Sequence, residues 1–269
     1  MNRILIAVLL LYCNITLGQN ITGTIISERT KQPVEYVNIG LAGKNIGTVS
    51  DANGKFAIAI DSQFDNDSLL FSSIGYDPVS IKVSDLRKDN ITVRLKEKIY
   101  ELSGVVVKPK KFVHKVLGIS THSKVAMAGF KDNFLGYEMG ILMKVKKSAV
   151  VKKVNLNISA CSFDTIFYRL NIYKVTGKNS FENILNKPIY INIPKDKIKE
   201  KIEIDLQPYN IVVDGDFLVT IEHIKNMGDG YLYFCAGLAG KTHYRKTSQG
   251  GWQTAPVGVS ISVDADVEK

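Results

Sequence analysis

The sequence predicts an all-β protein of two β-sandwich domains. Apolar and polar residues alternate in short segments, as at Phe56, Ile58 and Ile60, and this period of two is typical of strands with one buried face. Residues that favour turns separate these segments at short intervals, and helical periodicity is nearly absent. With 269 residues, the chain is long enough for two such domains.

The predicted first domain begins with a strand in which Ile21, Gly23 and Ile25 alternate with polar residues. The letters DANG at 51–54 predict a hairpin turn, because Asn and Gly tolerate positive φ and Asp bonds nearby amides. Gly75 is expected at a second sharp turn. In chain order the segments are ITGTIIS (21–27), TKQPVEYVNIGLAG (30–43), IGTVSDANGKFAI (46–58), LLFSSIGYDPVSIKV (69–83) and ITVRLKEK (91–98).

These five segments, in this order, resemble the carboxypeptidase-regulatory-like domain family, a transthyretin-like β-sandwich found in Bacteroidetes envelope proteins. The resemblance covers residues 21–107, about a third of the chain. It implies a seven-stranded accessory domain without catalytic residues, often placed ahead of an outer-membrane receptor. About 160 residues follow Val107, which is too few for a receptor barrel, so we do not expect a transport role.

The N-terminus has the pattern of a signal peptide over residues 1–18. Arg3 precedes a short apolar run from Ile4 to Tyr12, and small residues follow near Gly18. The run is too short to span a bilayer, and we expect no transmembrane span elsewhere. The sequence therefore predicts an exported protein in the periplasm, associated with the outer membrane or at the cell surface.

The net charge of +9 is concentrated in the middle of the chain, where residues 108–153 hold 11 basic and 2 acidic residues. We interpret 108–133 as a basic linker between a first domain at 19–107 and a second at 134–269. The lysines could contact an anionic surface, or they could simply keep a linker and the strand edges soluble. With few aromatic residues among the lysines, the pattern does not favour nucleic acid as a partner.

The second half again has the pattern of strands. The alternation predicts a larger β-sandwich or jelly roll, an architecture that does not by itself specify a function. The predicted strands are YEMGILMKV (137–145), AVVKKVNLNIS (149–159), TIFYRLNIYKV (165–175), KPIYINI (187–193), KIEIDL (201–206), FLVTIEHI (217–224), GYLYFCAG (230–237) and GVSISVDAD (258–266).

After removal of the leader with Cys13, two cysteines remain, Cys161 and Cys235. An oxidising compartment permits a disulfide between them. Two buried free thiols that pack as small hydrophobic side chains are the alternative.

No catalytic, metal or cofactor site is predicted. The four histidines lack the spacing of zinc ligands, and signatures of serine hydrolases, phosphate loops and thiol redox sites are absent. Three pairs of Asp or Asn residues could offer oxygen ligands to calcium, although turn formation also explains them. The histidines are His114, His122, His223 and His243, and the pairs are Asp51 with Asn53, Asp65 with Asp67, and Asp214 with Asp216.

The candidate ligand-binding residues are Tyr244, Arg245 and Trp252, which lie around a glycine-rich turn. Aromatic faces stack on sugar rings, and Arg donates planar hydrogen bonds to hydroxyl or carboxylate groups. In the alternative interpretation, Trp252 fills the sandwich core and Arg245 pairs with a carboxylate.

The sequence therefore predicts a non-enzymatic envelope protein for binding or scaffolding, whose partner is an envelope protein or a glycan. A carbohydrate-binding accessory protein of a polysaccharide-uptake system is the first alternative. A metal-dependent hydrolase with a site scattered along the sequence is the second.

Overall fold

A computed structural model describes residues 19–88, 90–99 and 111–269. The signal-peptide prediction for residues 1–18 and the last residues of the predicted first domain lie outside the described residues. The described part consists of strands and short 3-10 turns, which confirms the all-β prediction. It contains no helix that is long and apolar enough to span a membrane.

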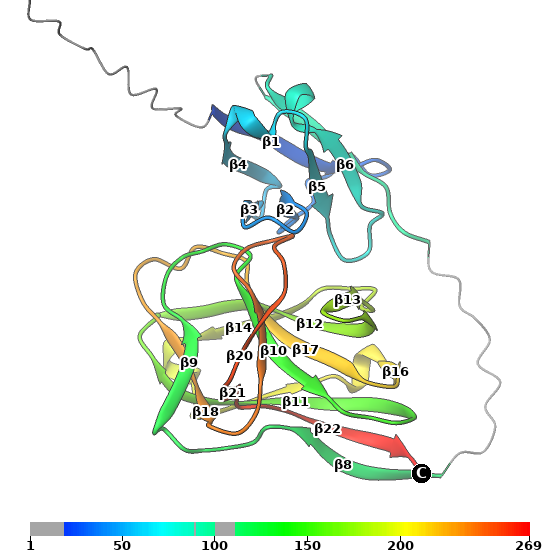
Figure 1. Cartoon of the computed structure of the whole chain (residues 1–269), viewed down its shortest axis with the longest axis vertical. Helices are drawn as coiled ribbons and strands as arrows, with labels where there is room; N and C mark the ends of the chain where they lie inside the picture. Colours follow the sequence, from blue (N-terminus) through cyan, green and yellow to red (C-terminus); the bar gives the residue numbers. More distant parts are fainter. Residues whose placement is uncertain (1–18, 89, 100–110) are drawn as a thin grey trace, which may run out of the picture.

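The first domain is a sandwich of two sheets with strand orders β4-β1-β7 and β3-β2-β5-β6, seen in the upper part of Figure 1. The predicted seven-stranded β-sandwich is confirmed. Apolar side chains from both sheets, among them Ile25, Ile39 and Phe71, fill its core. Its elements are β1 (Gln19–Ser27), β2 (Asn38–Leu41), β3 (Gly47–Val49), β4 (Lys55–Ile60), η1 (Ser62–Phe64), β5 (Ser68–Ser72), β6 (Val79–Lys82), η2 (Val83–Leu86) and β7 (Ile91–Leu95).

The turn predicted at 51–54 joins β3 to β4. The Asp51 Oδ1 atom accepts hydrogen bonds from the backbone amides of Asn53 and Lys55, both at 2.8 Å. Gly54 has φ of +70°, and a Cβ there would lie 2.4 Å from the carbonyl oxygen of Ile25. Glycine is therefore required both by the backbone conformation and by the close approach of β1.

The second domain is a larger sandwich of a seven-stranded and an eight-stranded sheet, in the lower part of Figure 1. The first has the order β13-β12-β17-β10-β19-β20, with β14 also paired to β12; the second has β21-β18-β11-β22-β8, with β15, β16 and β9 attached. Apolar residues of both sheets form one core between them. Its elements are β8 (Phe112–Gly118), β9 (Ala126–Phe130), β10 (Glu138–Met143), β11 (Ser148–Cys161), β12 (Thr165–Gly177), β13 (Ser180–Asn183), β14 (Ile189–Pro194), η3 (Lys195–Lys197), β15 (Lys201–Asp205), η4 (Gln207–Tyr209), β16 (Val212–Asp214), β17 (Phe217–His223), β18 (Leu232–Gly237), β19 (Thr242–Arg245), β20 (Gln253–Ala255), β21 (Gly258–Val259) and β22 (Ile261–Glu268).

The range 108–133, interpreted from its lysines as a linker, differs in the structure. Its described residues contain β8, which pairs with β22, and β9, which pairs with β18, so both strands belong to the second sandwich. The lysines before and between these strands, with Lys115 inside β8, led to the linker interpretation, and edge strands such as β8 tolerate exposed charges.

The lysines of the basic segment are partly neutralised by acidic residues from later strands. Lys144 contacts Asp216 at 2.8 Å, and Lys152 contacts Asp266 at 3.4 Å. On the folded surface, the positive charge around residues 108–153 is therefore smaller than their sequence alone indicates. This weakens the case for contact between this segment and an anionic surface.

The two cysteines are free thiols, Cys161 partly exposed and Cys235 buried. On the paired strands β11 and β18, Cys161 is opposite Leu232, three residues before Cys235. Because side chains alternate along a strand, Cys235 points to the opposite face of the sheet from Cys161. A disulfide would need a rearrangement of the sheet.

The two domains contact each other through a loop of residues 247–250, here called the docking loop. Gly40 and Gly47 are directly opposite each other on β2 and β3, and a Cβ on either would lie 2.4 or 2.3 Å from the carbonyl oxygen of Ser248. Ser248 is completely buried. The Gln249 carbonyl accepts a bond from the Gly43 amide at 2.8 Å. The glycine pair thus provides a surface free of side chains on which the loop rests.

Aromatic packing supports the same interface. Tyr36 and Val49 of the first domain form a small buried cluster with Ile224 of the second. The ring of Tyr36 lies 5.2 Å from that of Phe167 and 5.5 Å from that of Tyr190, measured between centroids. Buried apolar contacts at a domain boundary restrict relative motion of the domains.

Candidate functional site

Four charged side chains form one row across the seven-stranded sheet of the second domain. Arg169 on β12 is opposite Glu222 on β17. Glu222 is opposite Glu138 on β10, and Glu138 is opposite Arg245 on β19. The residues next to them in sequence pack into the core, so this charge row lies on the other face, toward the first domain.

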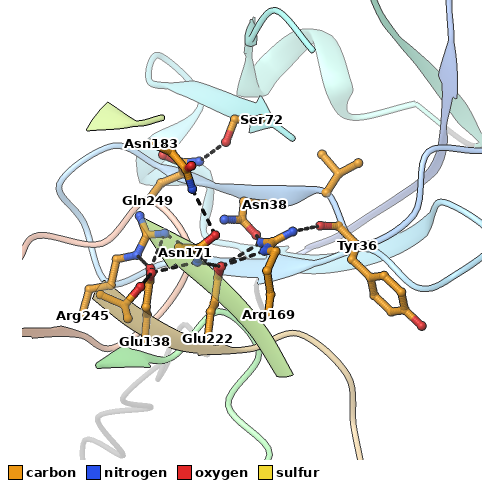
Figure 2. A network of polar contacts seen from close by, with 12 residues as sticks. Tyr36, Asn38, Ser72, Glu138, Arg169, Asn171, Asn183, Glu222, Arg245 and Gln249 are labelled. Carbon is orange, nitrogen blue, oxygen red and sulfur yellow. Dashed lines mark hydrogen bonds and ion pairs between the residues drawn. The ribbon is translucent and has the colours of Figure 1, made fainter. Parts of the chain in front are cut away.

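The charge row is buried and its members bind one another, as Figure 2 shows. The Arg169 Nε and Nη2 atoms donate to Glu222 Oε2 at 3.0 and 2.8 Å. The Arg245 Nε atom donates to Glu138 Oε2 at 2.7 Å. Asn171 lies between the carboxylates and donates through Nδ2 to Glu138 at 2.9 Å and to Glu222 at 2.7 Å.

Glu138 receives further hydrogen bonds that fix its carboxylate. The hydroxyl groups of Tyr173, at 2.9 Å, and of Thr220 both donate to its Oε1 atom. With Asn171 and Arg245, four side chains therefore donate to this one carboxylate. Such saturation compensates for the loss of water around a buried charge.

The two carboxyl groups have pKa shifts of opposite direction. Burial raises the pKa of Glu138, and the Glu222 charge adds to this against the opposing effect of Arg245. Burial also acts to raise the pKa of Glu222, but the guanidinium groups of Arg169 and Arg245 outweigh it and leave this pKa below its ordinary value. The environments therefore make Glu222 the more strongly ionised of the pair.

Arg169 also connects the row to the first domain. Its Nη1 atom donates to the carbonyl oxygen of Tyr36 at 2.8 Å, and its Nη2 atom donates to Asn38 Oδ1. Gln249 of the docking loop donates from Nε2 to Ser72 Oγ at 2.7 Å, and this bond also joins the two domains. In Figure 2, Asn38, Ser72 and Gln249 lie above the charge row and Tyr36 lies to its right.

A cleft of about 430 Å³ opens between the domains beside the charge row. We call it the interdomain cleft. Its lining combines strand β5 and the β5–β6 turn of the first domain with β12, β13 and Arg245 of the second. The residues that line it are Asn38, Leu70, Ser72, Ser73, Ile74, Gly75, Tyr76, Pro78, Lys98, Arg169, Asn171, Tyr173, Phe181, Glu182, Asn183, Leu185, Arg245 and Gln249.

Two nearly buried side chains in this lining have nitrogen donors that no described residue accepts. Arg245 and Asn38 are each 8% exposed. The bonds of Arg245 within the described part use Nε and Nη2, which leaves Nη1. The bond of Asn38 to Arg169 uses Oδ1, which leaves Nδ2. The cleft therefore presents hydrogen-bond donors to a ligand.

The structure brings together two of the three predicted ligand residues. The guanidinium carbon of Arg245 lies 5.1 Å from the centroid of the Trp252 ring. Trp252 also makes edge contacts with Tyr173 and Phe181 at 5.8 and 5.3 Å. Arg245 also pairs with a carboxylate, that of Glu138. This pairing is the one that the alternative interpretation of the sequence expected.

Tyr244 lies on the other face of β19, because adjacent residues of a strand point in opposite directions. Its ring stacks with that of Tyr137 at 6.3 Å, and its hydroxyl donates to Gln253 Oε1 at 2.8 Å. Both tyrosines line a second cavity of about 760 Å³, here called the aromatic cavity, with Phe130 and the 63% exposed Phe134.

Sequence reasoning missed Arg169, Glu138 and Glu222. A signal was present, because each charge stands within an otherwise apolar strand, as in FYRLNIY and LVTIEHI. Such a charge indicates a strand with both faces covered and a buried partner. The pairing of these strands across the sheet could not be deduced from their order in the chain.

The hydrolase alternative requires a group of side chains that could serve as metal ligands. Within residues 19–88, 90–99 and 111–269, no three or more His, Cys, Asp or Glu side chains are grouped so that they could hold a metal ion. His223 packs beside Tyr168 and Phe130, and burial lowers its pKa.

The chain is similar at low sequence identity to several solved structures. A putative carbohydrate binding protein from Bacteroides uniformis has 12% identity and a TM-score of 0.21, with 89% of this chain and 97% of that chain covered. The D431N mutant VP2 protein of infectious bursal disease virus has 9% identity and a TM-score of 0.19, with 93% and 62% covered. These TM-scores are too low to support an argument about fold or function. No curated protein sequence matches the chain.

The family comparison is specific and concerns the first domain. The family model of the CarboxypepD_reg-like domain matches residues 21–107, which confirms the resemblance seen in the five segments of the sequence. The described strands of this range form the β-sandwich set out above. The chain therefore contains a CarboxypepD_reg-like domain, to which residues 21–107 belong.

Proposed function

We propose that this chain is a non-enzymatic binding or scaffolding protein of the cell envelope and that its ligand lies in the interdomain cleft. The observation that carries the proposal is the combination of a buried, internally paired charge row with unused donors in the cleft. Glu138 and Glu222 are completely buried and held by neighbouring side chains, so they fix the site. The donors that remain, on Arg245 and Asn38, face a concave polar surface of the kind that binds small ligands.

The expected location follows from the leader and from the first domain. The signal-peptide pattern predicts export, and the CarboxypepD_reg-like domain supports a place in the cell envelope. The finer proposal is the periplasm, the outer membrane or the cell surface, with an envelope protein or a glycan as the partner.

A cleft-filling substitution tests the binding site. Ser73 lines the cleft, and Ser73→Trp would occupy much of it. Purified mature protein would be screened by thermal shift against a panel of neutral and acidic oligosaccharides. We expect a panel member that raises the Tm of the wild type and does not raise that of Ser73→Trp. Equal shifts in both proteins, no shift in the wild type, or a peptidase activity removed by a chelator would contradict the proposal.

The second candidate is a carbohydrate-binding accessory protein of a polysaccharide-uptake system that uses the aromatic cavity. The stacked pair Tyr137 and Tyr244 and the exposed Phe134 favour it, because aromatic rings provide contact surfaces for sugar rings. Here Phe134→Ala would weaken binding of a neutral oligosaccharide, and Ser73→Trp would not. Unchanged affinity in Phe134→Ala would exclude this cavity.

A further inference from the structure

The chemistry of the interdomain cleft indicates which class of ligand it accepts. Several side-chain donors of the cleft lining already donate hydrogen bonds to the two buried carboxylates, Glu138 and Glu222. Arg169 and Asn171 donate to Glu222, and Arg245 and Asn171 donate to Glu138. The donors that remain, Arg245 Nη1 and Asn38 Nδ2, therefore favour a ligand rich in acceptor atoms.

The unused guanidinium donor of Arg245 favours an anion. Arg169 and Arg245 line the cleft, and Glu182 is the acidic residue among its lining residues. Glu182 is itself paired with Lys174 at 2.8 Å. The carboxylates of the charge row are matched by their own guanidinium partners beneath the cleft. A guanidinium group is well suited to a carboxylate ligand because the hydrogen bond is charge-assisted.

The remaining lining favours a sugar over a peptide. Ser73, Asn183 and Gln249 carry hydroxyl or amide groups, which both donate and accept hydrogen bonds. The amides of Asn183 and Gln249 already bond to Asn171, Leu185 and Ser72, and each keeps a second N–H and a free acceptor lone pair for a polyhydroxylated ring. Phe181 and Tyr76 add aromatic surface for the apolar face of such a ring.

We infer that the interdomain cleft binds a sugar acid, a pyranose residue with a carboxylate such as a hexuronic acid within an acidic glycan. The carboxylate lies at Arg245 Nη1 and Asn38 Nδ2, and the hydroxyl groups lie toward Asn183 and Gln249. The inference rests on the proposed function, because it names the ligand class of the same cleft.

The test compares two probes of equal length by isothermal titration, a galacturonic acid tetramer and a neutral galactose tetramer. The mature wild-type protein is expected to bind the acidic probe at least about tenfold more tightly, the size of effect that a charged hydrogen bond contributes. An aspartate tetrapeptide serves as an acidic probe without a sugar ring.

Asn38→Asp is the diagnostic variant. It keeps the oxygen that accepts from Arg169, so the domain contact is retained, and it replaces the cleft-facing nitrogen by a carboxylate oxygen. We expect affinity for the acidic probe to fall about tenfold or more, and the Tm without ligand checks that the domain contact is intact. Ser73→Asp and Ser73→Asn form a second pair of nearly equal volume, of which the Asp variant alone is expected to weaken acidic binding.

The outcomes separate this inference from the proposed function. Equal affinity for both sugars, tighter binding of the aspartate peptide, or acidic binding that survives in both Asn38→Asp and Ser73→Asp overturns the sugar-acid inference. If Ser73→Trp still abolishes binding of one of these probes, the cleft remains the ligand site. If wild type binds none of the three probes, the sugar-acid inference fails, and the thermal-shift panel decides the proposed function separately.

Discussion

Glu138 and Glu222 lie directly opposite each other on the neighbouring strands β10 and β17, and both are completely buried. Two like charges in adjacent positions of a sheet repel each other. Arg245 at one end of the row and Arg169 at the other compensate for this repulsion, and Arg245 Nη2 lies 2.7 Å from Glu138 and 3.7 Å from Glu222. The stability of the interface therefore depends on the row as a unit.

Glu222→Gln is expected to destabilise the protein more than Glu138→Gln at pH 7. Without the Glu222 charge, the Arg169 guanidinium, whose side chain is 3% exposed, loses its ionic partner. Breaking a buried ion pair in this way costs about 3–5 kcal/mol. Glu138→Gln relieves the repulsion that helps to raise the pKa of Glu138, and Glu222 remains near Arg245. Urea unfolding of both variants checks the order, which equal losses would contradict.

The acid dependence of stability is expected to differ between wild type and Glu222→Gln. Because the folded-state pKa of Glu222 lies below the ordinary value of 4.5, its contribution is fully present above that pH. The contribution is lost as the pH falls below 4.5 through the lower folded-state pKa. Unfolding free energies measured from pH 7 down to pH 3 should fall more steeply in wild type than in Glu222→Gln. Parallel curves would show that Glu222 does not titrate in this way.

Gly47→Ala is expected to disturb the contact between the domains. The added methyl group would lie 2.3 Å from the Ser248 carbonyl oxygen, so the docking loop would have to move. Overpacking of this kind costs about 1–3 kcal/mol. Gly177→Ala is the matched control, because its Cβ would meet no atom closer than 3.6 Å. Hydrogen exchange of residues 247–250 should rise in Gly47→Ala alone; the same exchange in both variants would contradict the docking role of the glycine pair.

The mature protein is expected to contain two free thiols of different reactivity. Cys235 is 2% exposed and Cys161 is partly exposed, and burial raises the pKa of both thiols. Titration with a thiol reagent should therefore modify Cys161 first, slowly, and Cys235 after unfolding. A mass lower by two hydrogen atoms with no reactive thiol would demonstrate a disulfide and contradict the register of β11 and β18.

The sequence predicted local features well because they depend on neighbouring residues. The DANG turn and the alternation at Phe56 and Ile58 need only short-range information, and both are present in the structure. The site depended on contacts across the chain. Arg245 was identified from its residue type and from the aromatic and glycine residues near it in the sequence. Its partner Glu138 lies 107 residues away. Sequence order alone gives no register for such a pair, and the lysines before and within the range of β8 hid an edge strand.

Hydrogen exchange with and without the galacturonic acid tetramer tests the central proposal most directly, because it locates the ligand on the protein. A ligand in the interdomain cleft should protect residues 70–78 of the first domain and residues 171–183 of the second at the same time. Protection confined to one domain, or to residues 45–48 and 129–137, which line the aromatic cavity, would contradict a ligand in the interdomain cleft.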